Sequence, residues 1–120
     1  MTIQECYIEL GGNYDEVCTR LPSQSLVERF TLRFLDDKSF DELCTEIEAG
    51  HRAEAFRAAH TLKGVCANLA FTKLFNSASE LTELLRPETD TVPAEAAALL
   101  ENVRADYELT TATIRKYHGK

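Results

Sequence analysis

The apolar residues between positions 52 and 69 recur with the period of an α-helix. On a helix that turns about 100° per residue, five of them fall on one narrow stripe. They are Ala55, Ala59, Leu62, Cys66 and Leu69. The stripe predicts a helix that runs from about Arg52 to Asn68 and buries one face in a helical bundle. We expect Asn68 to end this helix in the left-handed cap conformation.

Residues 1–21 are expected to form two short helices that cover one end of a bundle formed by residues 23–117. Thr2 and Glu5 form a capping-box pattern before a short apolar set, and a pair of glycines ends the first helix. Residues 13–20 leave room for the second short helix.

The next segment predicts one bent or broken helical arm. Ser23 or Ser25 can cap its first part, which has an apolar face. The polar run at residues 36–38 interrupts that face. Ser39 and Glu42 then form a second capping-box pattern, which predicts that a new helix begins there.

Two more helices are expected after the central one. We expect Thr72 to cap the first of them, and its buried seam contains Phe71, Leu74, Ala78, Leu81 and Leu85. Residues 86–92 form the longest loop, and Pro93 suits the first turn of a last helix. The stripe of that helix contains Ala96, Leu99 or Leu100, Val103, Tyr107, Thr110, Ile114 and Tyr117. No segment alternates as a strand does, so we expect an all-α fold with residues 1–120 as one domain.

The composition is that of a soluble globular domain. The chain has 120 residues with a net charge of −7, which disfavours a nucleic-acid partner. No apolar run approaches 18 residues and no basic leader follows Met1, so we expect no membrane span, no signal peptide and a cytoplasmic location. The four cysteines and three histidines are widely spaced. We therefore expect no metal site, and reduced thiols packed in apolar faces.

His60 lies on the face of the predicted helix opposite the buried stripe. It points roughly 140° away from the centre of the stripe, so it should face solvent. An exposed imidazole is largely neutral near pH 7 and offers a nitrogen lone pair as a nucleophile. The residues expected to contact a partner around it are Ala53, Phe56, Arg57, Gly64, Ala67 and Asn68.

Gly64 and Lys63 suggest what chemistry His60 performs. A glycine inside a helix costs about 0.5–1 kcal/mol relative to alanine, so we interpret Gly64 as space for a macromolecule to approach the imidazole. Lys63, three residues after His60, can reach a phosphoryl group on the ring and offset its charge. The sequence has no phosphate-binding glycine loop and no acidic metal cluster, so the apparatus for phosphoryl transfer must come from a partner.

The run from Ala59 to Gly64, followed by residues 67–69 and 71–74, resembles the histidine-containing phosphotransfer (Hpt) domain of two-component phosphorelays. The resemblance covers nearly the whole chain. It implies an antiparallel up-and-down four-helix bundle whose exposed histidine, here His60, accepts a phosphoryl group and passes it on. The implied partners are the receiver domain of a response regulator, which we expect to hold Mg²⁺, and a hybrid sensor histidine kinase or its receiver domain.

Two positions depart from the family pattern. The family often has a glycine where this chain has Ala70. In the chemotaxis-kinase branch a glutamate from the next helix contacts the imidazole, and counting along residues 71–85 assigns that place to Thr82. A hydroxyl brings no charge, so we do not expect His60 to be phosphorylated in the manner of that branch.

We therefore predict a monomeric phosphocarrier with no cofactor of its own and no turnover of its own. The alternative is a binding module that captures a receiver domain or a kinase without accepting phosphate. A metal-dependent enzyme in the bundle interior is disfavoured, because no inward carboxylate or Glu-x-x-His pair is evident.

Overall fold

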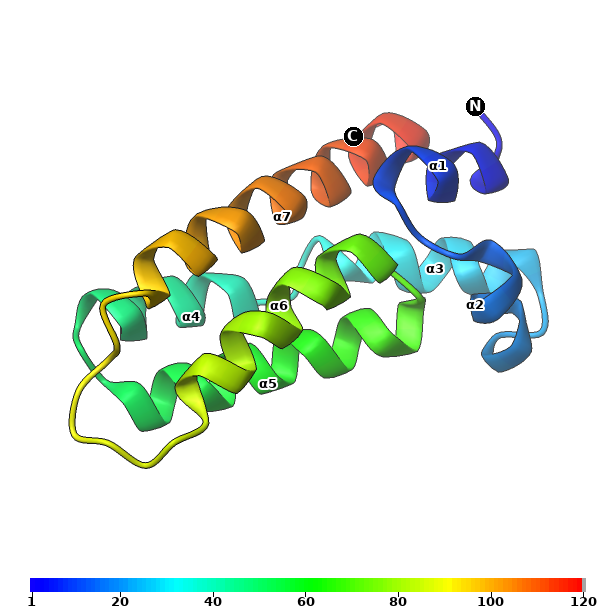
Figure 1. Cartoon of the computed structure of the whole chain (residues 1–120). Helices are drawn as coiled ribbons and strands as arrows, with labels where there is room; N and C mark the ends of the chain where they lie inside the picture. The colour runs from blue at the N-terminus through cyan, green and yellow to red at the C-terminus, as the bar shows by residue number, and fades with distance from the viewer. Residues whose placement is uncertain (120) are drawn as a thin grey trace.

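Seven α-helices form the regular structure of residues 1–119, which are the residues that the computed structural model describes. In chain order they are α1 (Ile3–Leu10), α2 (Tyr14–Arg20), α3 (Gln24–Phe34), α4 (Ser39–Glu48), α5 (Arg52–Leu69), α6 (Thr72–Leu85) and α7 (Ala96–His118) (Figure 1). No strand occurs in this range, so the all-α prediction is confirmed.

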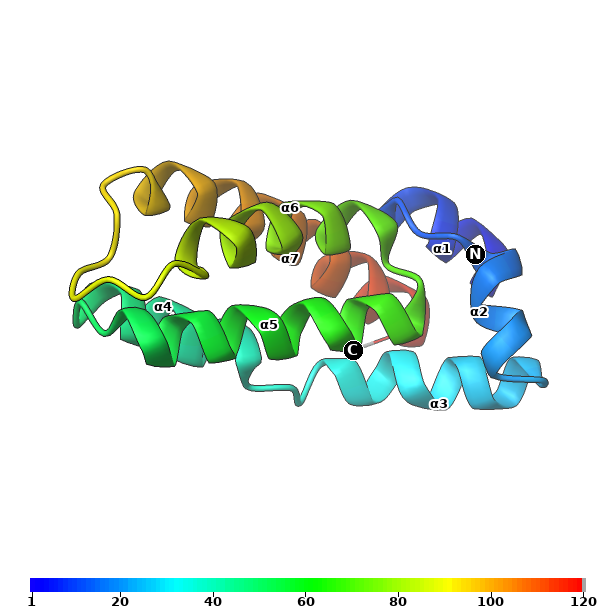
Figure 2. The same ribbon diagram turned by 60° about the horizontal axis from the view of Figure 1, so that its bottom comes forward.

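Four helices, α4 to α7, pack side by side along one long body. Each contacts the next in the chain, and α4 also contacts α7. The helices α2 and α3 lie at the end of the body where α5 finishes, and α1 packs against α7 (Figures 1 and 2). None of the helices within residues 1–119 is long and apolar enough to cross a membrane.

The central helix α5 buries the stripe that its sequence predicts. Ala55, Ala59, Leu62 and Cys66 are fully buried, and Leu69 is 7% exposed. The long helix α7 likewise turns its predicted stripe toward α3, α4 and α6. Helical periodicity therefore identified the inner faces of both helices correctly.

The C-terminus of α5 differs from the prediction. Asn68 does not end the helix, which continues through Leu69, and Ala70 takes the left-handed conformation with φ at 56°. Two hydrogen bonds from the N-terminal segment hold this turn. The Tyr7 hydroxyl donates to the Leu69 carbonyl at 2.8 Å, and the Asn13 N–H donates to the Ala70 carbonyl at 2.8 Å. These contacts fix α1 and α2 against the end of α5.

The capping prediction is right for the first helix and wrong for α4. Thr2 and Glu5 form the expected reciprocal capping box at the start of α1. At the start of α4, Ser39 makes no capping hydrogen bond through its side chain, and its own N–H donates to the carboxylate of Asp37 at 2.9 Å. The break between α3 and α4 is therefore stabilised by the polar run itself.

Two other predicted helix starts are wrong. Thr72 is the first residue of α6, and the cap position belongs to Phe71, which provides no side-chain hydrogen bond. Pro93 lies before α7, which begins at Ala96; the Ala96 N–H donates to the Pro93 carbonyl at 3.1 Å. Proline thus forms the turn that leads into α7.

The four cysteines are free thiols. Cys6 and Cys66 are buried as expected, and burial raises the pKa of each thiol. Cys44 is half-buried. Cys18 is exposed on α2, so the prediction that the thiols pack in apolar faces is wrong there.

Candidate functional site

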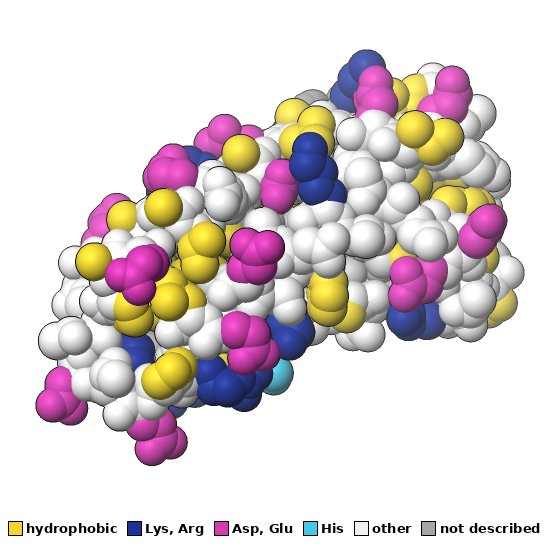
Figure 3. Space-filling view, viewed as in Figure 1, with side chains coloured by type: hydrophobic (Ala, Val, Ile, Leu, Met, Phe, Trp, Pro, Cys, Tyr) yellow, Lys and Arg dark blue, Asp and Glu magenta, His cyan; other side chains and the backbone are white. Residues whose placement is uncertain are grey.

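His60 lies midway along α5, and its side chain is exposed, as the helical pattern predicts. The residues before and after it in the buried stripe, Ala59 and Leu62, anchor the helix in the core. Figure 3 shows a group of Lys and Arg side chains beside a histidine over the middle of α5. The imidazole is thus carried on a rigid element and presented to solvent.

Phe56, one turn before His60, lies against the imidazole. The two ring centroids are 6.0 Å apart and the ring planes differ by 21°. Phe56 is half-buried and also packs on the core. The guanidinium of Arg86 lies over the Phe56 ring at 5.1 Å from its centroid. Phe56 therefore lies between the histidine and a cation at the end of α6, a contact that the helical pattern of α5 alone does not indicate.

Glu83 on α6 is the residue of the site that the sequence did not identify. Its carboxylate accepts two hydrogen bonds from Arg86, at 2.7 Å from Nε and 3.2 Å from the second guanidinium nitrogen. These hydrogen bonds lower the pKa of Glu83, and the charges of Arg86, of Lys63 and of the protonated form of His60 lower it further. A carboxylate from the neighbouring helix thus lies within electrostatic range of the histidine.

Thr82 does not occupy the place that counting along α6 assigned to it. It is completely buried, and its hydroxyl donates to the Ala78 carbonyl at 2.7 Å. The next residue, Glu83, is exposed and carries the charge toward α5. The carboxylate of α6 that acts electrostatically on His60 is therefore Glu83, one residue after the position reached by counting.

Lys63 and Gly64 flank His60 on the next turn. Lys63 is half-buried, whereas Gly64 is exposed. A Cβ built on Gly64 would have no neighbour within 4 Å beyond its own stretch of helix. Neither packing nor backbone conformation requires a glycine at this position. The effect of Gly64 is therefore to leave open space beside the imidazole.

The other predicted contact residues share the outer side of α5 with His60. Arg57 and Asn68 are exposed, and Ala53 and Ala67 are half-buried. Arg57 forms an exposed ion pair with Glu54 at 3.1 Å. Such pairs contribute little to stability, so this guanidinium can turn toward a partner at low cost.

One group of side chains in residues 1–119 has metal-binding geometry. The ligand atoms of Glu46, His51 and Glu54 all lie within 4.8 Å of one another at the junction of α4 and α5. Each already has a partner: His51 Nδ1 lies 2.8 Å from Glu46, and Glu54 pairs with Arg57. Two of the three side chains are exposed, so the geometry assigns no ion to them.

The chain was compared with known families and structures. A sequence profile of the Hpt domain matches residues 35–111, which include α4, α5, α6 and most of α7. No curated protein and no solved structure matches the chain.

Proposed function

The chain belongs to the Hpt domain family, whose members are phosphocarrier modules of phosphorelay signalling, and from this we propose that His60 is the residue that carries the phosphoryl group. The observation that carries the proposal is the exposed imidazole on α5, with open space over Gly64, Lys63 on the next turn and Arg86 over the neighbouring Phe56 ring. These are the requirements for a nucleophile that a second protein must reach.

The proposed reaction exchanges one phosphorus bond for another. A lone-pair nitrogen of the neutral His60 imidazole attacks the phosphorus of an aspartyl phosphate in a receiver domain. The N–P bond forms while the P–O bond to the aspartate breaks, and the aspartate leaves as a carboxylate. The other ring nitrogen keeps its proton during the attack. In the reverse direction a receiver aspartate attacks the phosphohistidine, and the imidazole leaves.

The charges around His60 are suited to hold the product. A phosphoryl group adds a charge between about −1.5 and −2 near pH 7. Lys63 is placed to offset it, and Arg86 can leave Glu83 for the phosphoryl oxygens, which are stronger acceptors. We propose that the Mg²⁺ and in-line positioning needed for the transfer are provided by the receiver domain or, in phosphorylation by a kinase, by that kinase.

One observation favours the alternative of a module that binds without accepting phosphate. Glu83 places a negative charge within range of His60, and that charge opposes a phosphoryl dianion on the ring. In the alternative, the same face of α5 sequesters a receiver domain or a kinase.

Labelled transfer distinguishes the two functions. Purified receiver domains are charged with radiolabelled acetyl phosphate and Mg²⁺, mixed with the protein, and scored for acid-labile label on it. Carrier function predicts label on the wild type and none on His60→Gln, while calorimetry shows that both still bind the receiver. Binding of both proteins with label on neither would establish the sequestering module instead.

A further inference from the structure

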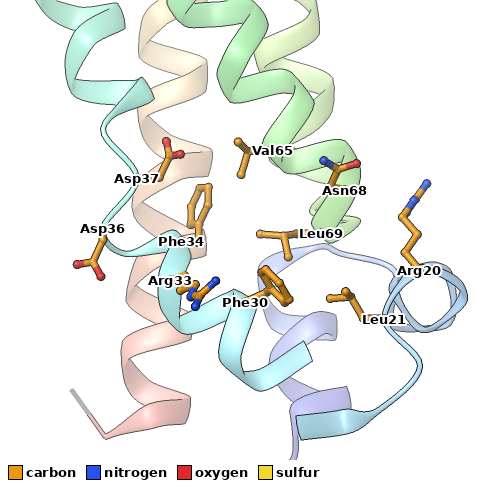
Figure 4. Close-up of a pocket in the computed structure, with 10 residues that line it drawn as sticks. All are labelled: Arg20, Leu21, Phe30, Arg33, Phe34, Asp36, Asp37, Val65, Asn68 and Leu69. Carbon is orange, nitrogen blue, oxygen red and sulfur yellow. The ribbon is translucent and has the colours of Figure 1, made fainter. Parts of the chain in front are cut away.

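Helices α5 and α6 form an antiparallel pair that is joined at one end by residues 70 and 71 and is open at the other. The two ends of α5 are held in different ways. At the joined end, Val65 and Leu69 line an apolar hollow of about 610 Å³ against side chains of the α2–α3 segment (Figure 4). At the open end, α5 begins and α6 finishes beside the loop of residues 86–95 (Figure 2).

The side chain of Arg52, the first residue of α5, bridges this open end. A terminal guanidinium nitrogen donates to the Leu85 carbonyl at 2.7 Å, and Nε donates to the Thr89 carbonyl at 2.9 Å. Leu85 is the last residue of α6, where carbonyls have no partner within the helix. A cation is disfavoured at the start of its own helix and favoured at the end of another. The charge of Arg52 therefore stabilises the end of α6.

The contacts of His60 with α6 lie within two turns of this bridge. Arg52, Phe56 and His60 follow one another at intervals of four residues, so they lie along one side of α5. The guanidinium of Arg86 lies over the Phe56 ring, and Arg86 directly follows the residue whose carbonyl Arg52 holds. Glu83, which acts electrostatically on His60, is hydrogen-bonded to Arg86.

The charged residues of α6 do not fix their own distance from His60. The pair of Glu83 and Arg86 lies within one helix and is exposed, so it adds little to the attachment of α6 to α5. The hydrogen bonds of Arg52 cross from α5 to α6, and its side chain is half-buried. The end of α6 is therefore held at α5 by Arg52.

We propose that Arg52 is a positioning residue, which holds the end of α6 so that Glu83 and Arg86 face His60 and set how much phosphoryl group the histidine retains. Arg52 acts through these two residues and does not touch the phosphoryl group. The inference rests on the proposed carrier function, because the quantity that it sets belongs to that reaction.

A double-mutant cycle tests the proposal. The measurement is the equilibrium partition of radiolabel between His60 and a receiver domain, chosen as the one that exchanges fastest with the wild type in a panel of purified receivers. In the wild type, Glu83→Gln should raise the share on His60 about threefold, because the repelling carboxylate is removed. In the Arg52→Gln background the same change should leave the share unaltered, because the carboxylate no longer faces the histidine.

Arg104→Gln is the matched control. Arg104 is half-buried on α7, and its guanidinium lies 3.4 Å from Glu101 and 3.7 Å from the Cys44 sulfur. In this background Glu83→Gln should still raise the share about threefold. Thermal unfolding shows whether each variant keeps its fold. If Arg52→Gln does not fold, Arg52→Lys takes its place, because lysine keeps the charge and loses the planar fork of donors; it should abolish most of the rise.

A threefold rise in the Arg52→Gln background would overturn the proposal. No rise in the wild type would overturn it as well, because Arg52 would then have nothing to position. If the wild type accepts no label from any receiver, the carrier function is refuted, and an NMR titration of the Glu83 carboxyl tests the positioning without phosphate. In Arg52→Gln the pKa of Glu83 should rise toward its ordinary value of 4.5, because Lys63 and protonated His60 lie farther away. An unchanged pKa would show that Arg52 does not position Glu83.

Discussion

Gly64 lies one turn after His60 on the exposed side of α5, and no atom beyond its own stretch of helix lies within 4 Å of the place a Cβ would take. An alanine would fit there without strain in the isolated chain. The space is therefore available only to a molecule that approaches from outside.

Gly64→Ala should separate stability from function. Alanine favours the helix over glycine by about 0.5–1 kcal/mol, so the free energy of unfolding should rise by that amount in urea titrations. Phosphoryl transfer to a receiver should fall about tenfold, because the added methyl group keeps the partner from the imidazole. The rate at which phosphoramidate labels His60 should stay unchanged, because this small donor reaches the imidazole without a protein interface. An equal gain in stability with unaltered receiver transfer would mean that Gly64 has no role in docking.

Gly12→Ala should have the opposite effect on stability. A Cβ at Gly12 would lie 2.8 Å from both the Ala70 carbonyl oxygen and a ring carbon of Tyr7. Because the Gly12 turn packs on the end of α5, relief of these contacts must shift backbone. We expect a loss of about 1–3 kcal/mol in the free energy of unfolding, measured beside Gly64→Ala as the matched glycine substitution. A loss below 0.5 kcal/mol, on the order of an ordinary surface change, would show that the N-terminal segment is loosely attached.

The parts of the site that lie on one helix could be predicted from the sequence. The exposure of His60 and Gly64 and the burial of Leu62 follow from one periodic pattern, because a helix fixes the directions of its own side chains. Glu83 and Arg86 come from α6, and their approach to His60 depends on how two helices are set against each other. Counting along the sequence assigned the place beside His60 to Thr82, which is buried, whereas the exposed Glu83 comes one residue later.

The helix ends were harder to predict, because tertiary contacts decide them. Local preference favours Asn68 over Ala70 in a left-handed conformation, since alanine there has a steric cost. The hydrogen bonds from Tyr7 and Asn13 to the last turn of α5 come from more than 50 residues earlier in the chain. They hold the turn at Ala70, and no pattern within α5 indicates them.

The Tyr117 hydroxyl donates a hydrogen bond to the Glu28 carboxylate and so joins the end of α7 to α3. This bond should make the free energy of unfolding vary with pH in the alkaline range. This bond raises the pKa of Tyr117 to about 12, from an ordinary value of 10.0. A raised pKa on an acid means that the neutral form is favoured in the folded state. The stabilisation that this hydrogen bond gives the folded state is therefore complete below pH 10 and is lost as the pH rises through 12.

Tyr117→Phe should accordingly lower the free energy of unfolding by about 1 kcal/mol at pH 8. The gap between wild type and variant should shrink from pH 10 upward in denaturant titrations. Cys6, whose pKa burial raises to about 11, titrates in the same range, and its negative charge also raises the pKa of Tyr117, in the same direction as the hydrogen bond. A gap that stayed constant to pH 12 would assign the loss to packing rather than to the hydrogen bond.

Glu83→Gln should shift the phosphoryl equilibrium toward the histidine. The carboxylate of Glu83 would repel the proposed phosphoryl dianion on His60, and it accepts hydrogen bonds from Arg86. Its neutralisation should therefore remove the repulsion and weaken the hold on the guanidinium. With a receiver present in excess, we expect the ratio of phosphohistidine to aspartyl phosphate to rise about threefold at low ionic strength, with a smaller rise at 1 M salt because exposed charges are screened. The measurement is the partition of radiolabel between the two proteins at equilibrium.

Two controls make the result specific to Glu83. Glu80→Gln removes the same charge from an exposed position on α6 that lines a hollow beside α7, and it should leave the ratio unchanged. Thr82→Val removes a buried hydroxyl whose hydrogen bond stays within α6, so it too should have no effect on the ratio. If Glu80→Gln raised the ratio as much as Glu83→Gln, the effect would belong to the net charge of the chain. If only Thr82→Val raised it, the helix register described for α6 would be wrong, and the group that opposes phosphate on His60 would be the hydroxyl rather than the carboxylate.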